Sequence, residues 1–174
     1  MSTGSAVLLG TEKRLLTAFH VVSRVTDKKV LKSEQVKIEV LSPEGKKLSD
    51  AEVFKADAVN DLAVLQVLNK AVLTSEESED LILASKVKTG EQVFAMGFPL
   101  KETMVITEGI VNAAQAKVNG KRSLLMSAQV VSGMSGGPVF NERAELVGII
   151  SGSFRTMNGI HLVSDRTALA ALLK

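Results

Sequence analysis

The sequence predicts an all-β protein, either a barrel or a sandwich, that ends in one short helix. Short apolar runs separated by turn residues recur along most of the chain, which is typical of barrels and sandwiches. Strands that alternate with long helical patterns, as in α/β proteins, are absent from the pattern. The 174 residues, 45% hydrophobic and 23% charged, suffice for one domain or two small subdomains with a buried core.

Five runs in the first part of the chain have the length and composition of strands. Gly10 and the polar residues after it separate the first two runs, which indicates a hairpin. The third run alternates apolar and polar residues with a period of two, and Pro43 and Gly45 lie in the turn after it. The fifth is a nearly continuous apolar run that starts directly after Asp61. The five predicted strands cover residues 5–9, 14–18, 36–41, 51–54 and 62–68.

The polar and acidic segment TSEESED, residues 74–80, is the best linker candidate in the chain. We therefore predict two subdomains, residues 1–75 and residues 76–174. Five further strand-like runs follow the linker, and they cover residues 92–96, 104–113, 123–131, 146–151 and 159–163.

Only the end of the chain has a helical pattern. Ser164 or Asp165 can cap a helix in which Leu169, Leu172 and Leu173 share one face. The sequence therefore predicts a short amphipathic helix as the last element.

Composition excludes several classes of function. The chain has no cysteine, so disulfides, thiolate metal sites and cysteine nucleophiles are excluded, and no His, Asp and Glu cluster has metal-ligand spacing. A net charge of +2 with no Tyr or Trp argues against nucleic-acid binding. No apolar run is long enough to span a membrane. The N-terminus lacks the features of a signal peptide, which favours the cytoplasm unless an export signal has been removed. The oligomeric state is left open.

A serine between glycines is the strongest chemical signal. Residues 133–137 read GMSGG, and glycines let backbone N–H groups approach a ligand closely, as an oxyanion hole built from the main chain requires. The same string is also compatible with a flexible glycine turn, and it matches the nucleophile elbow of α/β-hydrolases. A nucleophilic Ser135 would need an imidazole partner, and the chain has only His20 and His161.

The order of the candidate residues separates these possibilities. An α/β-hydrolase would need Ser135, then Glu142 or Glu145, then His161, which crowds the triad into 27 residues without helical crossovers, so we reject it. The other order is His20, Asp61 and Ser135, with separations that fit a site assembled from different parts of a barrel fold. Taken singly, each of the three is as easily a structural residue of a turn or strand end. Asp57, four residues before Asp61, is a competing acid.

The segments TAFHVV, DLAVLQV and GMSGGPVF, in that order, resemble the His, Asp and Ser motifs of the trypsin-like serine proteases. The likeness is closest to the protease domain of the bacterial HtrA/Deg group, and we expect no PDZ module in this chain. GEQVFAMGFPL, ITEGIVNA, LVGIISGSF and NGIHLVS also resemble strands of that domain, so the similarity covers nearly the whole chain.

The resemblance implies two six-stranded antiparallel β-barrels with the active site between them and a C-terminal helix. It implies that His20 is the general base, Asp61 its orienting carboxylate and Ser135 the nucleophile, with the N–H groups of Gly133 and Ser135 as the oxyanion hole. Asp61 is preferred to Asp57 because it directly precedes the apolar strand, as the family's catalytic aspartate does. Such a triad needs no cofactor or metal. The partners expected are polypeptide substrates.

The resemblance also implies a substrate-binding cleft, whose predicted residues are Gln129, Val130, Ser151, Gly152, Ser153, Gly159 and His161. The wall segments hold no Asp or Glu to pair with a substrate Lys or Arg, so a small to medium apolar residue is expected before the cleaved bond. Met134 replaces the Asp or Asn usual in the family, so activation by a new N-terminal amine is not expected. The alternative function is a catalytically silent module that binds extended peptides in the cleft.

Overall fold

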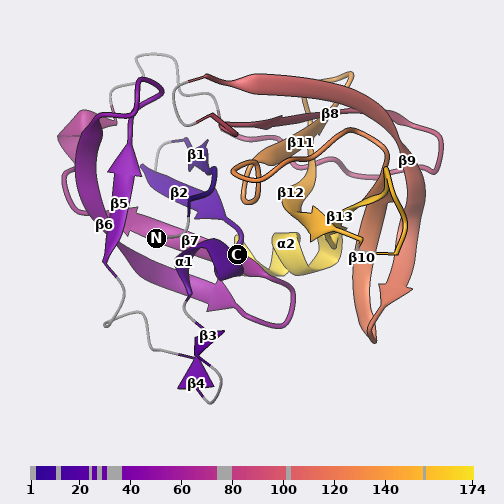
Figure 1. Cartoon of the computed structure of the whole chain (residues 1–174), viewed down its shortest axis with the longest axis horizontal. Coiled ribbons are helices and arrows are strands. Elements are labelled where there is room, and N and C mark those ends of the chain that lie inside the picture. Colours follow the sequence, from indigo (N-terminus) through magenta and orange to yellow (C-terminus); the bar gives the residue numbers. More distant parts are fainter. Residues whose placement is uncertain are drawn as a thin grey trace.

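The structure is a computed structural model that describes residues 3–10, 13–23, 25–26, 29–30, 37–73, 80–100, 103–154 and 156–174. It is an all-β fold with a short C-terminal helix, as predicted (Figure 1). Two sheets account for most of the chain, one from each half of the sequence.

The N-terminal half forms a five-stranded antiparallel sheet in the order β1-β2-β7-β6-β5. These strands are β1 (Val7–Leu9), β2 (Arg14–Thr17), β5 (Ile38–Leu41), β6 (Lys47–Asp57) and β7 (Leu62–Val67). All five correspond to predicted strands. In the described residues β1 and β5 do not pair with each other, so the second closed six-stranded barrel implied by the resemblance is not confirmed.

The N-terminal half also has short elements that the sequence did not predict. They are the helix α1 (Phe19–Val22), the strand pair β3 (Val25–Thr26) and β4 (Lys29–Val30), and a 3-10 turn (Lys70–Val72). Each spans four residues or fewer, which is too short for a hydrophobic period to reveal.

The C-terminal half is a closed antiparallel barrel in the order β10-β13-β12-β11-β8-β9. The strands are β8 (Gln92–Gly97), β9 (Val105–Val118), β10 (Lys121–Met126), β11 (Pro138–Asn141), β12 (Leu146–Ser153) and β13 (His161–Ser164). Two predictions need correction. The strand expected over residues 123–131 ends at Met126, and β11 was not predicted, because a run of four residues directly after a glycine turn carries little periodic signal.

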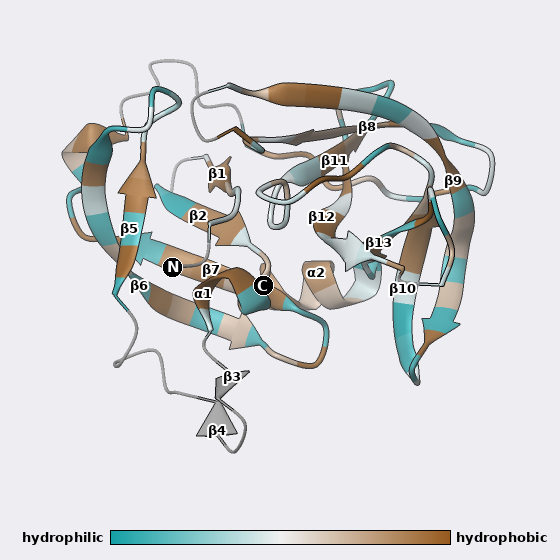
Figure 2. Ribbon diagram, in the orientation of Figure 1, coloured by the Kyte–Doolittle hydropathy of each residue, from teal (hydrophilic) through white to brown (hydrophobic). Residues whose placement is uncertain are grey.

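The terminal helix α2 (Arg166–Leu172) joins the two halves. The Asp165 carboxylate accepts a hydrogen bond from the Ala168 N–H and so caps the helix. Its Leu169 and Leu172 belong to a buried cluster that also contains Leu16 of β2 and Leu146 of β12. Figure 1 shows α2 between the sheet and the barrel, and in Figure 2 the neighbouring β2 and β12 carry hydrophobic colours. A separate cluster fills the barrel and another lies on the N-terminal sheet. The predicted boundary between residues 75 and 76 lies outside the described residues and stays a prediction.

Candidate active site

His20 and Asp61 form a hydrogen-bonded pair at the edge of the N-terminal sheet. His20 lies in α1, directly after β2, and Asp61 directly precedes β7, the strand that pairs with β2. The Nδ1 atom of His20 lies 2.8 Å from Oδ2 of Asp61. The two side chains are 45% and 22% exposed, so the imidazole can be reached from solvent while the carboxylate is largely covered.

The backbone at Asp61 explains why this pair forms. Asp61 has a φ of +56°, in the left-handed region that Asp and Asn tolerate better than most residues. Ala18 precedes α1 and has no side chain to cap it. Asp61 supplies the missing acceptors instead, since its carbonyl accepts the N–H of Phe19 at 3.2 Å and its Oδ1 accepts the N–H of His20 at 2.8 Å. The carboxylate is therefore held against His20 by both backbone and side chain.

Ser151 of β12 connects this pair to the barrel. Its hydroxyl donates to Oδ2 of Asp61 at 2.5 Å, the oxygen that also contacts the imidazole. The sequence placed Ser151 among the residues of the substrate cleft and did not predict this contact. A serine in an apolar strand carries no signal of its distant partner, so only the fold reveals it.

The electrostatics of the pair favour the charged forms. The hydrogen bond to Asp61 raises the pKa of His20 above its ordinary value, against the lowering effect of burial. At Asp61 burial acts to raise the pKa, but the hydrogen bonds from His20 and Ser151 outweigh it and the pKa is lowered. Asp61 is thus an ionised carboxylate beside an imidazole whose protonated form it stabilises.

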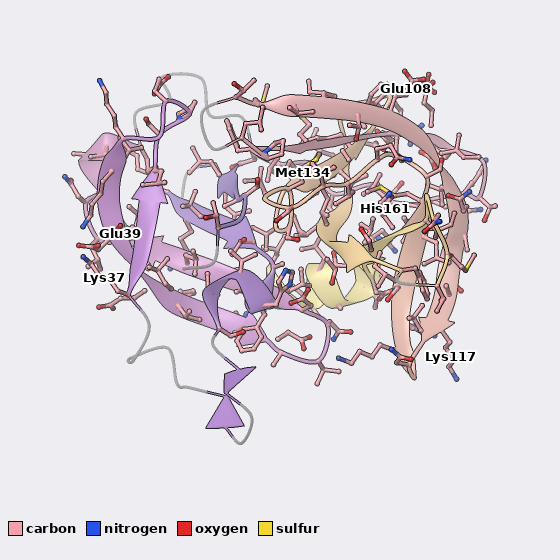
Figure 3. The ribbon with its side chains drawn as sticks, in the orientation of Figure 1. Lys37, Glu39, Glu108, Lys117, Met134 and His161 are labelled. Atoms are coloured by element: carbon pink, nitrogen blue, oxygen red, sulfur yellow. The ribbon has the colours of Figure 1, made fainter. Side chains whose placement is uncertain are left out.

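The loop that carries Ser135 packs against the segment that carries His20. A Cβ placed on Gly136, whose φ is +86°, would clash with Oγ1 of Thr17 in β2. A Cβ placed on Gly4 would lie 2.9 Å from the carbonyl oxygen of Ser135 and clash with Val21, the residue after His20. Only glycine fits at these two close approaches. Figure 3 shows Met134, the residue before Ser135, in the loop where the barrel faces the N-terminal sheet.

The loop is also fixed to the strand that carries Ser151. The N–H of Gly136 donates to the carbonyl of Ile150 at 2.8 Å, and the N–H of Ile150 donates to the carbonyl of Gly137 at 2.9 Å. Ser151 follows Ile150, so Ser135 and the serine that bonds Asp61 are held on adjacent backbone segments. The structure thus brings His20, Asp61 and the Ser135 loop together. Within the described residues the Ser135 hydroxyl has no hydrogen-bond partner.

Two backbone donors around Ser135 have no acceptor among the described residues. The N–H of Met134 donates to the carbonyl of Val131 at 3.1 Å, and Gly133 has a φ of +96°, which together define a type II turn. The N–H groups of Met134, Gly136 and Gly137 all have backbone acceptors. Those of Gly133 and Ser135 have none among the described residues. Two backbone donors with one residue between them, neither bonded within the described residues, are what an oxyanion hole needs.

Asp57, the competing acid, has a different task. It ends β6, and its Oδ1 accepts the N–H groups of Val59 and Asn60 while its Oδ2 accepts the side-chain amide of Asn60. These bonds shape the turn that leads to Asp61. Burial acts to raise the pKa of Asp57, but the Asn60 and Val59 bonds outweigh it and the pKa is lowered.

Three predicted cleft residues end β12. The Ser151 hydroxyl is engaged by Asp61, and the Ser153 hydroxyl lies 2.8 Å from Nδ1 of His161. A Cβ on Gly152 would meet no atom within 4 Å, so the strand borders open space at this residue.

His161, the first residue of β13, is 5% exposed and has both ring nitrogens bonded. Its Nε2 accepts the N–H of Val130 at 3.4 Å, so Nδ1 carries the proton and donates to Ser153. Burial lowers the pKa of His161. The neutral ring joins the segment before Ser135 to β12.

Gln129 and Gly159 lie close together beside that segment. A Cβ on Gly159 would lie 3.9 Å from Nε2 of Gln129, and the carbonyl of Gln129 accepts the hydroxyl of Thr107 in β9 at 2.7 Å. Segments 127–131, 150–153 and 158–161 therefore contact one another, and the substrate cleft itself stays a prediction.

In the part of the chain that the structure describes, no three His, Asp or Glu residues are placed to hold a metal ion. No helix of that part is long and apolar enough to cross a membrane.

Comparison with known proteins agrees with this geometry. The model of the family described as trypsin-like peptidase domain matches residues 4–149. A probable periplasmic DegP-like serine endoprotease of Rhizobium meliloti is 31% identical over 159 residues, which cover 90% of this chain and 29% of the relative. The chloroplastic protease Do-like 5 of Arabidopsis thaliana is 28% identical over 166 residues, covering 87% of this chain and 48% of the relative.

Solved structures show the same likeness. A serine endoprotease from Yersinia pestis superposes with a TM-score of 0.69 at 28% identity, covering 97% of this chain and 54% of the other. The chain belongs to the trypsin-like peptidase domain family, and several of the relatives it resembles are named as DegP-like serine endoproteases.

The chain spans about a third of the length of several curated relatives it matches. Those relatives also bear on location. Several are named periplasmic and one chloroplastic, so the cytoplasmic expectation is not supported.

Proposed function

We propose that the chain is a serine endopeptidase that cleaves peptide bonds through an acyl-enzyme on Ser135. The observation that carries the proposal is the pair formed by His20 and Asp61, which Ser151 ties to the backbone segment beside Ser135. The family's enzymes are named as endoproteases, which agrees with this chemistry.

In the proposed reaction His20 acts as the general base. Its Nδ1–H donates to the Asp61 carboxylate, which leaves Nε2 with a lone pair to take the proton of the Ser135 hydroxyl. The Ser135 Oγ then attacks the peptide carbonyl, and the negative charge that develops on its oxygen is stabilised by the N–H groups of Gly133 and Ser135. The imidazolium gives its proton to the leaving amine, and water, activated by the same imidazole, hydrolyses the acyl-enzyme.

A fluorophosphonate probe tests the proposal, because it labels only an activated serine. The wild-type protein and a Ser85→Ala control, in which an exposed serine outside the site is changed, should both be labelled. Ser135→Ala should not be labelled and should lose peptidase activity by several orders of magnitude. An unlabelled wild-type protein would instead indicate the silent peptide-binding module.

We further propose that the residue before the cleaved bond is apolar and small to medium, such as Val, Ala, Leu or Met. The proposed walls, residues 127–131, 150–153 and 158–161, contain no carboxylate, so a substrate Lys or Arg would be buried unpaired. His161 is the only titratable group in them, and its nitrogens already bond Val130 and Ser153. Cleavage of a peptide library should show this preference. Cleavage mainly after Lys or Arg would refute it, and cleavage mainly after Glu or Gln would make His161 a recognition residue.

A further inference from the structure

Ser5, a buried residue just before β1, uses all of its polar groups in contacts around the proposed site. Its hydroxyl donates to the carbonyl of Gly133 at 2.7 Å and accepts the N–H of Phe98 at 2.9 Å. Its N–H donates to the carbonyl of Ser135 at 2.8 Å, and its carbonyl accepts the hydroxyl of Thr17 at 2.7 Å. The side chain is 5% exposed, so these bonds are shielded from water.

Two of these contacts fix the peptide groups next to the free donors. The peptide between Gly133 and Met134 is held at both ends, by Ser5 at its carbonyl and by Val131 at its N–H. The peptide after Ser135 is held in the same way, by the Ser5 N–H at its carbonyl and by Ile150 at its N–H. Ser5 thus anchors the loop on both sides of the nucleophile.

The loop needs such an anchor because its own residues supply little resistance to rotation. Gly133 has no Cβ to restrict its φ and ψ, so the two peptide groups that flank it turn easily against each other unless outside contacts hold them. The side chain of Met134 is apolar and lies in the barrel core, so it forms no polar bond to the turn. The hydroxyl of Ser5, 128 residues away in sequence, therefore supplies a restraint that the loop lacks.

We propose that Ser5 is a positioning residue for the reaction, holding the loop so that the N–H groups of Gly133 and Ser135 converge on one oxygen. This role rests on the proposed function. Because an oxyanion exists only in the transition state and the tetrahedral intermediate, looser donors slow the chemical step without weakening the binding of the uncleaved peptide. Loss of the Ser5 hydroxyl should therefore lower kcat and leave KM nearly unchanged.

The test compares Ser5→Ala with a matched control, Ser49→Ala. Ser49 lies in β6 and is 7% exposed, and its hydroxyl also donates to one backbone carbonyl, that of Asp50, and accepts one backbone N–H, that of Asn69. Both changes remove the same kinds of bonds, but only Ser5 contacts the Ser135 loop. Thermal unfolding of both variants measures the purely structural cost.

The readouts are kcat and KM on a peptide from the library screen and the affinity for a peptide boronic acid, whose tetrahedral adduct places an oxygen between the two donors. Removal of a whole oxyanion donor typically costs about 100-fold to 1000-fold in kcat, so loosening both donors in Ser5→Ala should cost about tenfold. The boronic acid should lose affinity by a similar factor, while Ser49→Ala matches wild type. If Ser5→Ala does not fold, Ser5→Cys, with a similar shape and a weaker donor, takes its place and should lose several-fold in kcat.

Equal kcat and boronic acid affinity in the Ser5 and Ser49 variants would overturn the role of Ser5 while leaving the proposed function intact. A higher KM in Ser5→Ala with an unchanged kcat would also overturn the role of Ser5. A wild-type protein that neither cleaves peptides nor reacts with the fluorophosphonate would refute the proposed function and this role with it.

Discussion

Replacing Asp61 by asparagine should inactivate the enzyme through the tautomer of His20. The amide has the same shape as the carboxylate, and asparagine tolerates the φ of +56°. In the wild type Oδ1 of Asp61 accepts the backbone N–H of His20 at 2.8 Å, so the amide oxygen of the asparagine has to take the place of Oδ1. The amide nitrogen then faces both Nδ1 of His20 and the hydroxyl of Ser151.

An amide nitrogen donates and cannot accept, so it selects the His20 tautomer with the proton on Nε2. That nitrogen can then no longer take the proton of Ser135. The same substitution in a serine protease triad lowers kcat by about 10⁴-fold with the geometry intact, and we expect a loss of this order here. The pKa of His20 should also fall, since the hydrogen bond to Asp61 is the largest cause of its elevation.

Asp57→Asn is the matched control, four residues away in the same turn. Its amide oxygen can still accept the N–H groups of Val59 and Asn60, and only the bond to the Asn60 side chain is lost. We expect kcat/KM within about twofold of wild type and a loss of about 1 kcal/mol in the free energy of unfolding, the usual value for one hydrogen bond.

The assay is kcat/KM of the two variants on the same peptide, with urea unfolding to show that both are folded. A reversed order, with Asp57→Asn inactive and Asp61→Asn active, would refute the assignment of the carboxylate. Asp61→Asn with more than about a tenth of wild-type activity would refute the tautomer argument, which allows about 10⁻⁴.

Three further predictions concern pH and packing. The kcat/KM of the wild type should rise with pH through an apparent pKa above the 6.5 expected for an isolated histidine, because Asp61 raises the pKa of His20; a pH profile that falls through neutrality would contradict a histidine base. Gly136→Ala should fail to accumulate as folded, active protein, because the added methyl meets Thr17 and the φ is positive; a soluble variant with normal kinetics would disprove the close approach. His161 has its pKa lowered in the folded state, so the unfolded chain binds its proton first and stability should fall as pH drops below about 6.5. Denaturant unfolding at a series of pH values should show a weaker fall in His161→Gln, and identical slopes would show that His161 does not contribute.

Most of the strands and the terminal helix could be predicted because each depends on neighbours in sequence. A period-two pattern buries one face of a strand wherever that strand lies, and Asp165 caps α2 through a residue three positions away. The elements and strand ends that were predicted wrongly or missed have no signal in their local sequence. The strand β11 and the helix α1 are four residues each, and the end of β10 at Met126 depends on contacts made in three dimensions.

For the candidate site, the sequence determined which residue types could do the chemistry, since a serine among glycines, one histidine at a strand end and one aspartate before a strand are visible in the chain itself. It favoured Asp61 over Asp57 through the family resemblance, but it could not reveal that Ser151 bonds Asp61 or that Ser5 bonds Gly133. Those contacts join residues 90 and 128 positions apart. A hydrogen bond depends on distances and angles between two atoms, and only the packing of the sheet against the barrel brings such distant groups within reach.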